Sequence, residues 1–150
     1  MKVELRLWTP KDIKFACTVR NSPELMRWFR QSEFISYKQQ EAFILTDIKW
    51  RHYNGFVILA NGKPAGLCGV KNTLEFTIGV LPEYQKKGIA TKAMKLLMGM
   101  YPKMWSHVFV DNPALTWYIR KLGFKAVGVK ERAYHKEGVG LIDVVKIAHE

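Results

Sequence analysis

The sequence has few cysteines and no long apolar run, and both absences narrow the class of protein. Cys17 and Cys68 are the only 2 cysteines among 150 residues, too few for a disulfide scaffold and without the spacing of metal ligands. No apolar run approaches the ~20 residues of a membrane span, and the N-terminus lacks the apolar segment of a signal peptide. We therefore expect a cytoplasmic protein with no disulfide, no bound metal and no membrane partner.

Linkers and repeats are absent as well. No stretch is rich in glycine, serine or proline, and no segment of the chain repeats another. Apolar residues make up 48% of the sequence, which is typical of a packed globule, and the length suits one core. The sequence predicts a single domain over residues 1–150, either monomeric or homodimeric.

Acidic residues are scarce relative to basic ones. There are 13 aspartates and glutamates against 24 lysines and arginines, which gives a net charge of +11 at pH 7. Such a field attracts polyanions, which include nucleic acid and also the phosphates of coenzyme A. Because the basic residues are scattered along the chain, the charge does not separate these ligands. It does disfavour a polycation such as a polyamine, which the field would repel.

The most informative segment runs from Glu75 to Ala90. Polar and apolar residues alternate up to Val80, as in a strand, and Pro82 ends the run because it cannot donate to a ladder. A basic loop around Gly88 then leads into a segment rich in helix formers. The free N–H groups and the dipole at the start of such a helix favour phosphate binding. An ordinary strand–turn–helix with two solvated lysines is the alternative.

Two motifs follow one another along this half of the chain. The first is Gln85-x-x-Gly88-x-Ala90, and the second begins at Asn112 and contains Ala114, Tyr118 and Leu122-Gly123-Phe124. Together they resemble the GNAT superfamily of acyl-CoA-dependent N-acetyltransferases. The opening of the chain looks like the subgroup that contains ribosomal-protein, spermidine and amino-sugar N-acetyltransferases.

The resemblance implies an α/β (α+β) GNAT fold with acetyl-CoA as cosubstrate. That fold is a mixed, mostly antiparallel twisted sheet of six to seven strands, with helices on both faces and a splay between strands 4 and 5. The pantetheine arm is expected to lie in the splay, next to a bulge that we place at Gly79. The cofactor-binding residues that the resemblance implies are Ile78, Gly79, Val80, Gln85, Lys86, Lys87, Gly88, Ile89, Ala90, Thr91, Asn112, Ala114 and Tyr118.

Periodicity and turn residues predict the other elements. The predicted strands are 2–8, 56–59, 65–70, 74–80, 107–110, 124–129 and 141–147. Helices are predicted to begin near 10, 25, 37, 88 and 112, the third extending to about 53 with an apolar side made of Phe43, Leu45, Ile48 and Trp50. Asn61-Gly62 predicts a hairpin turn, and Asn112 and Gly123 predict the two ends of the last helix.

Acetyl transfer to an amine requires a neutral amine, a donor to the carbonyl oxygen and a proton for the departing thiolate. A backbone N–H between Ile78 and Val80 is expected to serve the oxygen. Tyr118 matches the tyrosine that acts as general acid in many superfamily members, and a tyrosine stays protonated at pH 7. Packing against the cofactor is the alternative role for Tyr118.

The base that accepts the proton of the amine is left open. Glu75 lies where the subgroup often carries an acidic residue that faces the acceptor. His107 stands where relatives that acetylate ribosomal-protein N-termini carry a glutamate, and histidine titrates near neutral pH. A lone histidine on an apolar strand is nevertheless often a core residue. A chain of water molecules without a single base is the third alternative.

The acceptor is also left open. A peptide or protein N-terminal amine and an amino sugar rank equally, and a polyamine ranks third. Residues 21–31, 34–37 and 134–138 are expected to recognise it, and the acids that could receive its ammonium group are Glu24, Glu33 and Asp143. The alternative to an enzyme is a basic GNAT-like domain that binds RNA or a ribosomal surface without turnover. The intact loop from Gln85 to Ala90 speaks against that alternative, because a binding module does not need it.

Overall fold

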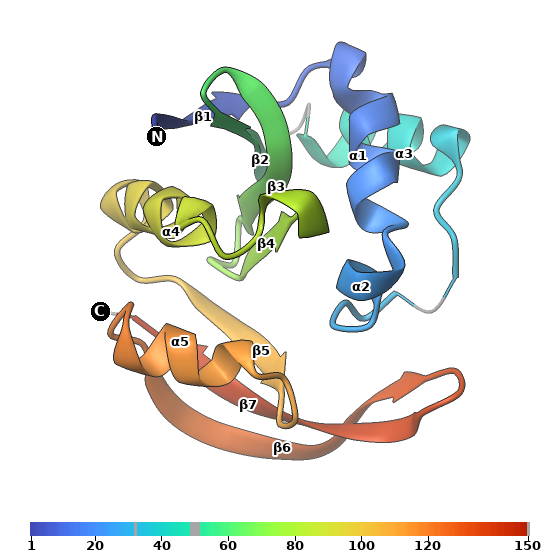
Figure 1. Ribbon diagram of the computed structural model, residues 1–150. Coiled ribbons are helices and arrows are strands. Elements are labelled where there is room, and N and C mark those ends of the chain that lie inside the picture. Colours follow the sequence, from blue (N-terminus) through green and yellow to red (C-terminus); the bar gives the residue numbers. More distant parts are fainter. Residues whose placement is uncertain (32, 49–51, 150) are drawn as a thin grey trace.

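Seven strands in two sheets form the frame of the part of the chain that the structure describes (Figure 1). The computed structural model describes residues 1–31, 33–48 and 52–149. The strands are β1 Val3–Leu7, β2 Tyr53–Ala60, β3 Lys63–Lys71, β4 Phe76–Val80, β5 Trp105–Phe109, β6 Lys125–Lys136 and β7 Gly140–Ala148. The first sheet has the order β1-β2-β3-β4 and the second has the order β5-β7-β6, with antiparallel neighbours in both.

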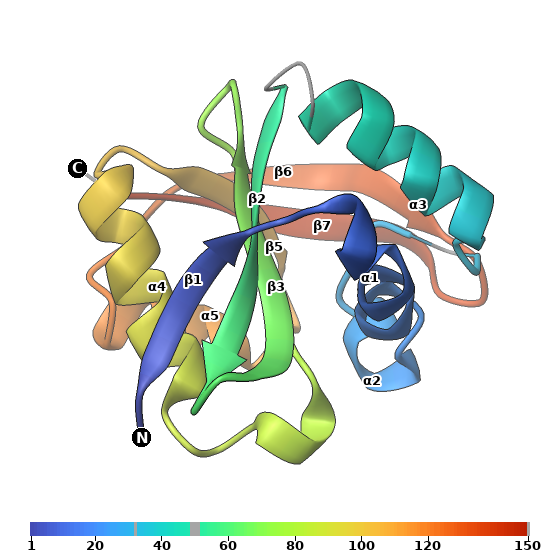
Figure 2. The same ribbon diagram turned by 90° about the horizontal axis from the view of Figure 1, so that it is seen from above.

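Helices cover the four-stranded sheet on both sides (Figures 1 and 2). They are α1 Ile13–Arg20, α2 Pro23–Met26, α3 Tyr37–Phe43, α4 Ile89–Met100 and α5 Ala114–Arg120, with short 3₁₀ segments at Pro10–Asp12 and Pro82–Tyr84 and a π-helical segment at Ile44–Ile48. None of the helices in the described ranges is long and apolar enough to span a membrane.

The alternation of side chains along β2 separates two core layers. Phe56 and Ile58 pack in the cluster that holds the buried face of α4, whereas Val57 packs in the cluster that holds the buried face of α1. This is the period-2 pattern of a strand that is covered on both faces. Tyr118 from α5 joins the α4 layer, so that α5 links the two sheets.

The two sheets meet at the start of β4 and β5 and then separate. Glu75 and Trp105 form one parallel bridge, and the Trp105 N–H donates to the carbonyl of Leu74 at 3.1 Å. The Ser106 hydroxyl donates to the Phe76 carbonyl at 3.1 Å, and beyond this point β4 pairs with β3 and β5 pairs with β7. The predicted splay between strands 4 and 5 is thus confirmed, together with the predicted fold class.

The predicted long helix from 37 to 53 was wrong in its second half. It begins as predicted, with Ser36 as its cap, but regular α-helix ends at Phe43. Tyr53 is the first residue of β2, because its ring packs over the bare backbone of Gly55 and Gly69 and its hydroxyl contacts Thr77 at 2.6 Å. These contacts come from segments distant in the sequence, and they override the local helical pattern.

The apolar side predicted for that helix was also misplaced. Ile44 is buried, whereas Leu45 is 53% exposed. Trp50 lies outside the described residues, and the side chain of Ile48 is not among those described. The π-helical segment that starts at Ile44 changes the angular spacing, so a 3.6-residue period no longer gives the buried side.

The bulge predicted at Gly79 is not present. The β3–β4 pairing runs without a shift from Gly66–Val80 to Val70–Phe76. A Cβ atom on Gly79 would lie 3.0 Å from Cζ of Phe29, so the glycine serves a close approach of that ring to the strand. A glycine within a strand marks either a bulge or a close contact, and the sequence alone does not distinguish the two.

The second sheet has a bulge that the sequence did not reveal. Strand β6 runs to Lys136, well past the predicted end at 129, and its register shifts between Lys130 and Tyr134. Arg132 has φ 49 there, and its N–H donates to Oδ1 of Asp143 at 2.8 Å. Such a bulge bends a strand and redirects its side chains. The hairpin turn at Asn61-Gly62, by contrast, was predicted correctly, with positive φ at both residues.

Candidate active site

The side chains predicted to act in catalysis line one cavity. The cavity has a volume of about 740 Å³, and its wall includes Glu75, His107 and Tyr118. These residues come from the start of β4, from β5 and from α5, so the splay brings them together. Ile78, Gly79 and Asn112 from the predicted cofactor set line the same cavity, whereas residues 85–91 do not.

The backbone of β4 presents donors to the splay. The Lys71 N–H donates to the Glu75 carbonyl at 2.8 Å. This bond and the register show which residues of β4 form hydrogen bonds with β3. In such a ladder alternate residues bond the partner strand, so Gly79 faces β3. The N–H groups of Ile78 and Val80 therefore point the other way, toward the splay. A chain with amide groups, such as pantetheine, could bond them as an added strand would.

The loop before α4 has the form of an anion site. Gly88, with φ 77, stands at the N-cap and supplies no side chain to the first turn, so the N–H groups of Ile89, Ala90 and Thr91 have no side-chain cap. Gln85 fixes the loop to the end of β4, because its Nε2 donates to the Val80 carbonyl at 2.9 Å. The positive end of the helix dipole adds to this preference for an anion.

Helix α5 lies against that loop. The Asn112 side chain accepts a bond from Ala114 N–H at 2.9 Å and so caps the first turn, and the Trp117 indole donates to Thr91 at 3.0 Å. At the other end the Phe124 N–H donates to the Tyr118 carbonyl at 3.0 Å, past Gly123 with φ 79. The predicted capping by Asn112 and the glycine at the C-terminal end are both confirmed.

Tyr118 is buried among aromatic rings of the core. Its ring packs edge-on against Phe76 and Phe124, with centroid distances of 5.6 and 5.8 Å. Burial raises the pKa of Tyr118 well above its usual value. The phenol therefore stays protonated at neutral pH, and it faces a cavity that the rest of its ring helps to close.

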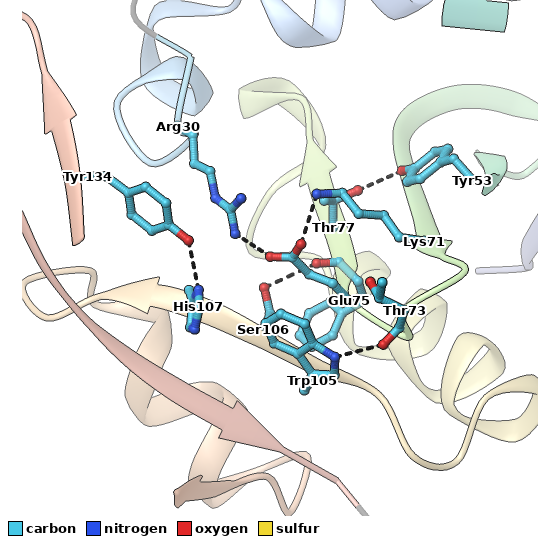
Figure 3. A network of polar contacts seen from close by, with 11 residues as sticks. Arg30, Tyr53, Lys71, Thr73, Glu75, Thr77, Trp105, Ser106, His107 and Tyr134 are labelled. Atoms are coloured by element: carbon cyan, nitrogen blue, oxygen red, sulfur yellow. Dashed lines mark hydrogen bonds and ion pairs between the residues drawn. The ribbon is translucent and has the colours of Figure 1, made fainter. Parts of the chain in front are cut away.

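Glu75 is occupied by two cations (Figure 3). Its side chain is 8% exposed, and it accepts a bond from Nζ of Lys71 at 2.8 Å and another from a guanidinium nitrogen of Arg30. Both carboxylate oxygens thus have a positively charged donor. A carboxylate held in this way joins the start of β4 to the segment after α2, and each of its oxygens already accepts a bond from a cation.

His107 has a different environment (Figure 3). Its Nδ1 lies 2.7 Å from the Tyr134 hydroxyl, and its ring contacts Trp105 edge-on at a centroid distance of 5.2 Å. Burial, followed by the charge of Arg30, lowers the pKa of His107, and burial raises that of Tyr134. The imidazole is therefore neutral at pH 7 and able to accept a proton. The bulge in β6 is what places Tyr134 against it.

Two polar anchors that the sequence did not suggest hold the acceptor side of the cavity. Nζ of Lys136 is buried and donates to the carbonyls of Met26, Phe29 and Gln31, the last two at 2.6 and 3.1 Å. Asn21 exchanges two bonds with the backbone of Ile35, at 2.8 and 2.9 Å. Their partners lie 14 or more residues away in the sequence, and neither position carries a local signal of its role.

The acids expected to receive an ammonium group do not line the cavity. Glu24, Glu33 and Asp143 are all missing from its wall, and Asp143 is used in the β6 bulge. The expected segments 21–31 and 34–37 do contribute, through Trp28, Phe29 and Ile35. The acceptor side is thus lined by rings, amides and cations.

The fold and the site agree with the comparison to known families. Residues 2–125 match the acetyltransferase (GNAT) domain family. The chain belongs to the GNAT acetyltransferases. It is 31% identical to the spermidine N(1)-acetyltransferase of Escherichia coli (strain K12), over 84% of this chain and 74% of that protein.

Solved structures of GNAT enzymes have the same fold. The spermidine N-acetyltransferase of Vibrio cholerae, in complex with CoA and spermine, has a TM-score of 0.87 at 23% identity and covers 97% of this chain and 94% of its own. An acetyltransferase of Salmonella typhimurium that modifies the N-terminal serine of a ribosomal protein has a TM-score of 0.80 at 17% identity, over 99% and 95% of the two chains. The predicted superfamily and subgroup are confirmed, and this GNAT protein is an acetyl-CoA-dependent N-acetyltransferase that acts on an amine.

Proposed function

We propose that this GNAT enzyme acetylates a primary amine by direct attack in a ternary complex, with His107 as the base and Tyr118 as the acid. The observation that carries the proposal is that both side chains line one cavity at the splay, a neutral imidazole and a protonated phenol. An acid and a base whose environments hold them in opposite protonation states are what this chemistry requires.

Each step has a group on this chain to serve it. Acetyl-CoA supplies an acetyl group that is activated as a thioester. His107 accepts the proton that the attacking amine loses, and Tyr134 holds the imidazole in place from its other side. One of the two N–H groups of Ile78 and Val80 would donate to the carbonyl oxygen, where negative charge develops. As the N–C bond forms and the C–S bond breaks, Tyr118 donates its proton to the sulfur.

The cosubstrate is assigned to the loop and the splay together. The uncapped N–H groups from Ile89 to Thr91, with Lys86 and Lys87 beside them, would hold the pyrophosphate. The other of the two N–H groups of Ile78 and Val80 would bond a pantetheine amide, and Asn112 and Ala114 at the start of α5 would border that arm. Gly79 has no side chain, and this lets the Phe29 ring approach the strand.

The sequence left Glu75, His107 and a water chain open as the base. Two cations occupy the oxygens of Glu75 in the folded protein, and for this reason His107 is preferred. The proposed role of Glu75 is to position Arg30 and β4. A cytoplasmic location remains a prediction, as do the single domain and the oligomeric state.

Acetyl-CoA binding is the direct test of the proposed site. In isothermal titration calorimetry we expect micromolar affinity for the wild type and a loss of about 100-fold or more for Gly88→Glu, which places a carboxylate and a strained φ at the anion site. Gly99→Glu is the matched control, because it adds the same charge at the far end of α4, where a side chain meets nothing within 4 Å. Its affinity should stay within about two-fold of the wild type.

Thiol release with a panel of amines then tests turnover. Acetyl-CoA-dependent release with at least one primary amine supports the proposal. Wild-type protein that binds no acetyl-CoA, but binds RNA with a steep salt dependence, would overturn it in favour of a basic binding domain.

A further inference from the structure

Arg20 is a cation in the cavity that lacks an anionic partner. It is the last residue of α1, and its guanidinium lines the cavity and lies over the Phe29 ring at 4.7 Å from the centroid. The ion pairs formed among the described residues do not include Arg20. Arg20 is partly buried, and this burial lowers its pKa. A guanidinium in this position is set up to receive an anion.

The other charges on the wall do not supply that anion. Arg30 and Lys71 share Glu75, and Asp47 faces His52 at 3.4 Å. The wall therefore carries three arginine or lysine side chains against two carboxylates, and the unmatched charge is that of Arg20. Trp8 on the same wall has an indole N–H with no hydrogen-bond acceptor among the described residues, which leaves a second donor unused.

The position of Arg20 relates it to the point of acetyl transfer. The Phe29 ring that it covers is the ring that approaches β4 at Gly79. One aromatic ring thus separates the guanidinium from the strand whose N–H groups face the splay. Arg20 and His107 line the same cavity, so an acceptor whose amine reaches His107 can present a second group to Arg20.

We infer that Arg20 selects acceptors that carry an anionic group, a carboxylate or a phosphate, in addition to the amine. The inference rests on the acetyl transfer proposed above and names the class of acceptor. It excludes a polyamine as the preferred acceptor, because a polycation would meet Arg20 without a carboxylate to offset it. The spermidine named for the relatives is then not the preferred substrate of this chain.

Matched acceptors test the inference through kcat/KM. One pair is Ala-Glu amide against Ala-Gln amide, a second is glucosamine 6-phosphate against glucosamine, and spermidine is the polycation. We expect at least one anionic member to exceed its neutral counterpart about 10-fold or more, the size of one charge-assisted contact. Which pair shows the difference identifies a carboxylate or a phosphate as the anion.

Variants at Arg20 assign the effect to this residue. Arg20→Gln should remove that preference through KM and leave the neutral acceptor and acetyl-CoA affinity within about two-fold. Arg20→Glu should raise kcat/KM for spermidine relative to the anionic acceptor. Arg27→Gln is the control, because Arg27 stacks on Trp28 at 4.7 Å in the next segment but does not line the cavity.

The outcomes separate this inference from the proposed function. An enzyme that acetylates amines without an anionic preference, or that prefers spermidine and is unchanged by Arg20→Gln, overturns the inference alone. An enzyme that turns over no amine in the panel and binds no acetyl-CoA overturns the proposed function as well. Unfolding midpoints of Arg20→Gln and Arg20→Lys near the wild type show that lost preference is not lost folding.

Discussion

The two sides of the splay are built on different principles. On the cosubstrate side, β4, the loop at 85–88 and the first turn of α4 follow one another in the chain, and their working groups are backbone N–H groups. On the acceptor side, the working groups are side chains such as Arg30, Glu75 and Tyr134, which come from distant segments and meet through ion pairs and hydrogen bonds. The first side is proposed to bind acetyl-CoA, the cosubstrate common to the family, and the second is proposed to select the amine.

This difference teaches where variation is tolerated. A backbone donor keeps its position after most side-chain substitutions, provided that the backbone conformation does not change. Position 88 is an exception, because its positive φ favours glycine. A side-chain network can instead be rewired by one substitution on either partner. Variants on the two sides should therefore fail in different ways.

The largest effect is expected at Tyr118, where the two sides meet. Tyr118→Phe should lower kcat by about 10²–10³-fold, because the thiolate then departs without a proton donor. Acetyl-CoA affinity and the unfolding midpoint should change little, since the ring and its packing remain. Tyr101→Phe, on a partly buried tyrosine outside the cavity, is the control in the same steady-state assay. A fall in kcat of less than three-fold would contradict the acid role and indicate that Tyr118 only packs against the cofactor.

A smaller effect on kcat is expected at His107. Because burial lowers its pKa below the usual 6.5 of histidine, the imidazole stays neutral at pH 7 and takes up a proton only in more acidic solution. The wild type should thus show an acid limb in log kcat below about pH 6.5 that His107→Gln lacks, with kcat lowered about 10–100-fold at pH 7. His135→Gln, on the exposed side of β6, should keep the limb. An unchanged profile in His107→Gln would point to a water chain as the base.

The smallest effect on kcat is expected at Glu75, with the loss appearing in stability. Glu75→Gln leaves Arg30 and Lys71 without their shared carboxylate, and we expect the free energy of unfolding to fall by about 1–3 kcal/mol while kcat falls less than 10-fold. Urea unfolding measures the change in the free energy of unfolding. Glu4→Gln breaks an exposed pair with Lys2 at 3.7 Å and should cost less than about 0.5 kcal/mol. A 100-fold loss of kcat at wild-type stability would make Glu75 the base after all.

The division between the two sides also explains what the sequence could predict. The strand, the loop glycine and the caps at Asn112 and Gly123 are local signals, and the motifs that contain several of them carried the resemblance that implied the cosubstrate side and the splay. The bulge in β6, the close approach of Phe29 to Gly79 and the clamp by Lys136 depend on contacts between distant segments. Glu75 and His107 were found as candidates by position, but only their partners in space distinguish a paired carboxylate from a neutral imidazole.

The most direct test of this division is the acetyl-CoA affinity of the double variant Arg20→Gln/His107→Gln, measured by calorimetry. It removes the acceptor-side cation and the proposed base together and leaves the backbone of β4 and the loop untouched. Affinity within about two-fold of the wild type, with kcat lowered about 10–100-fold, is the predicted result. A weakening of tenfold or more in a folded protein would contradict the account, because the acceptor side chains would then hold the cosubstrate too.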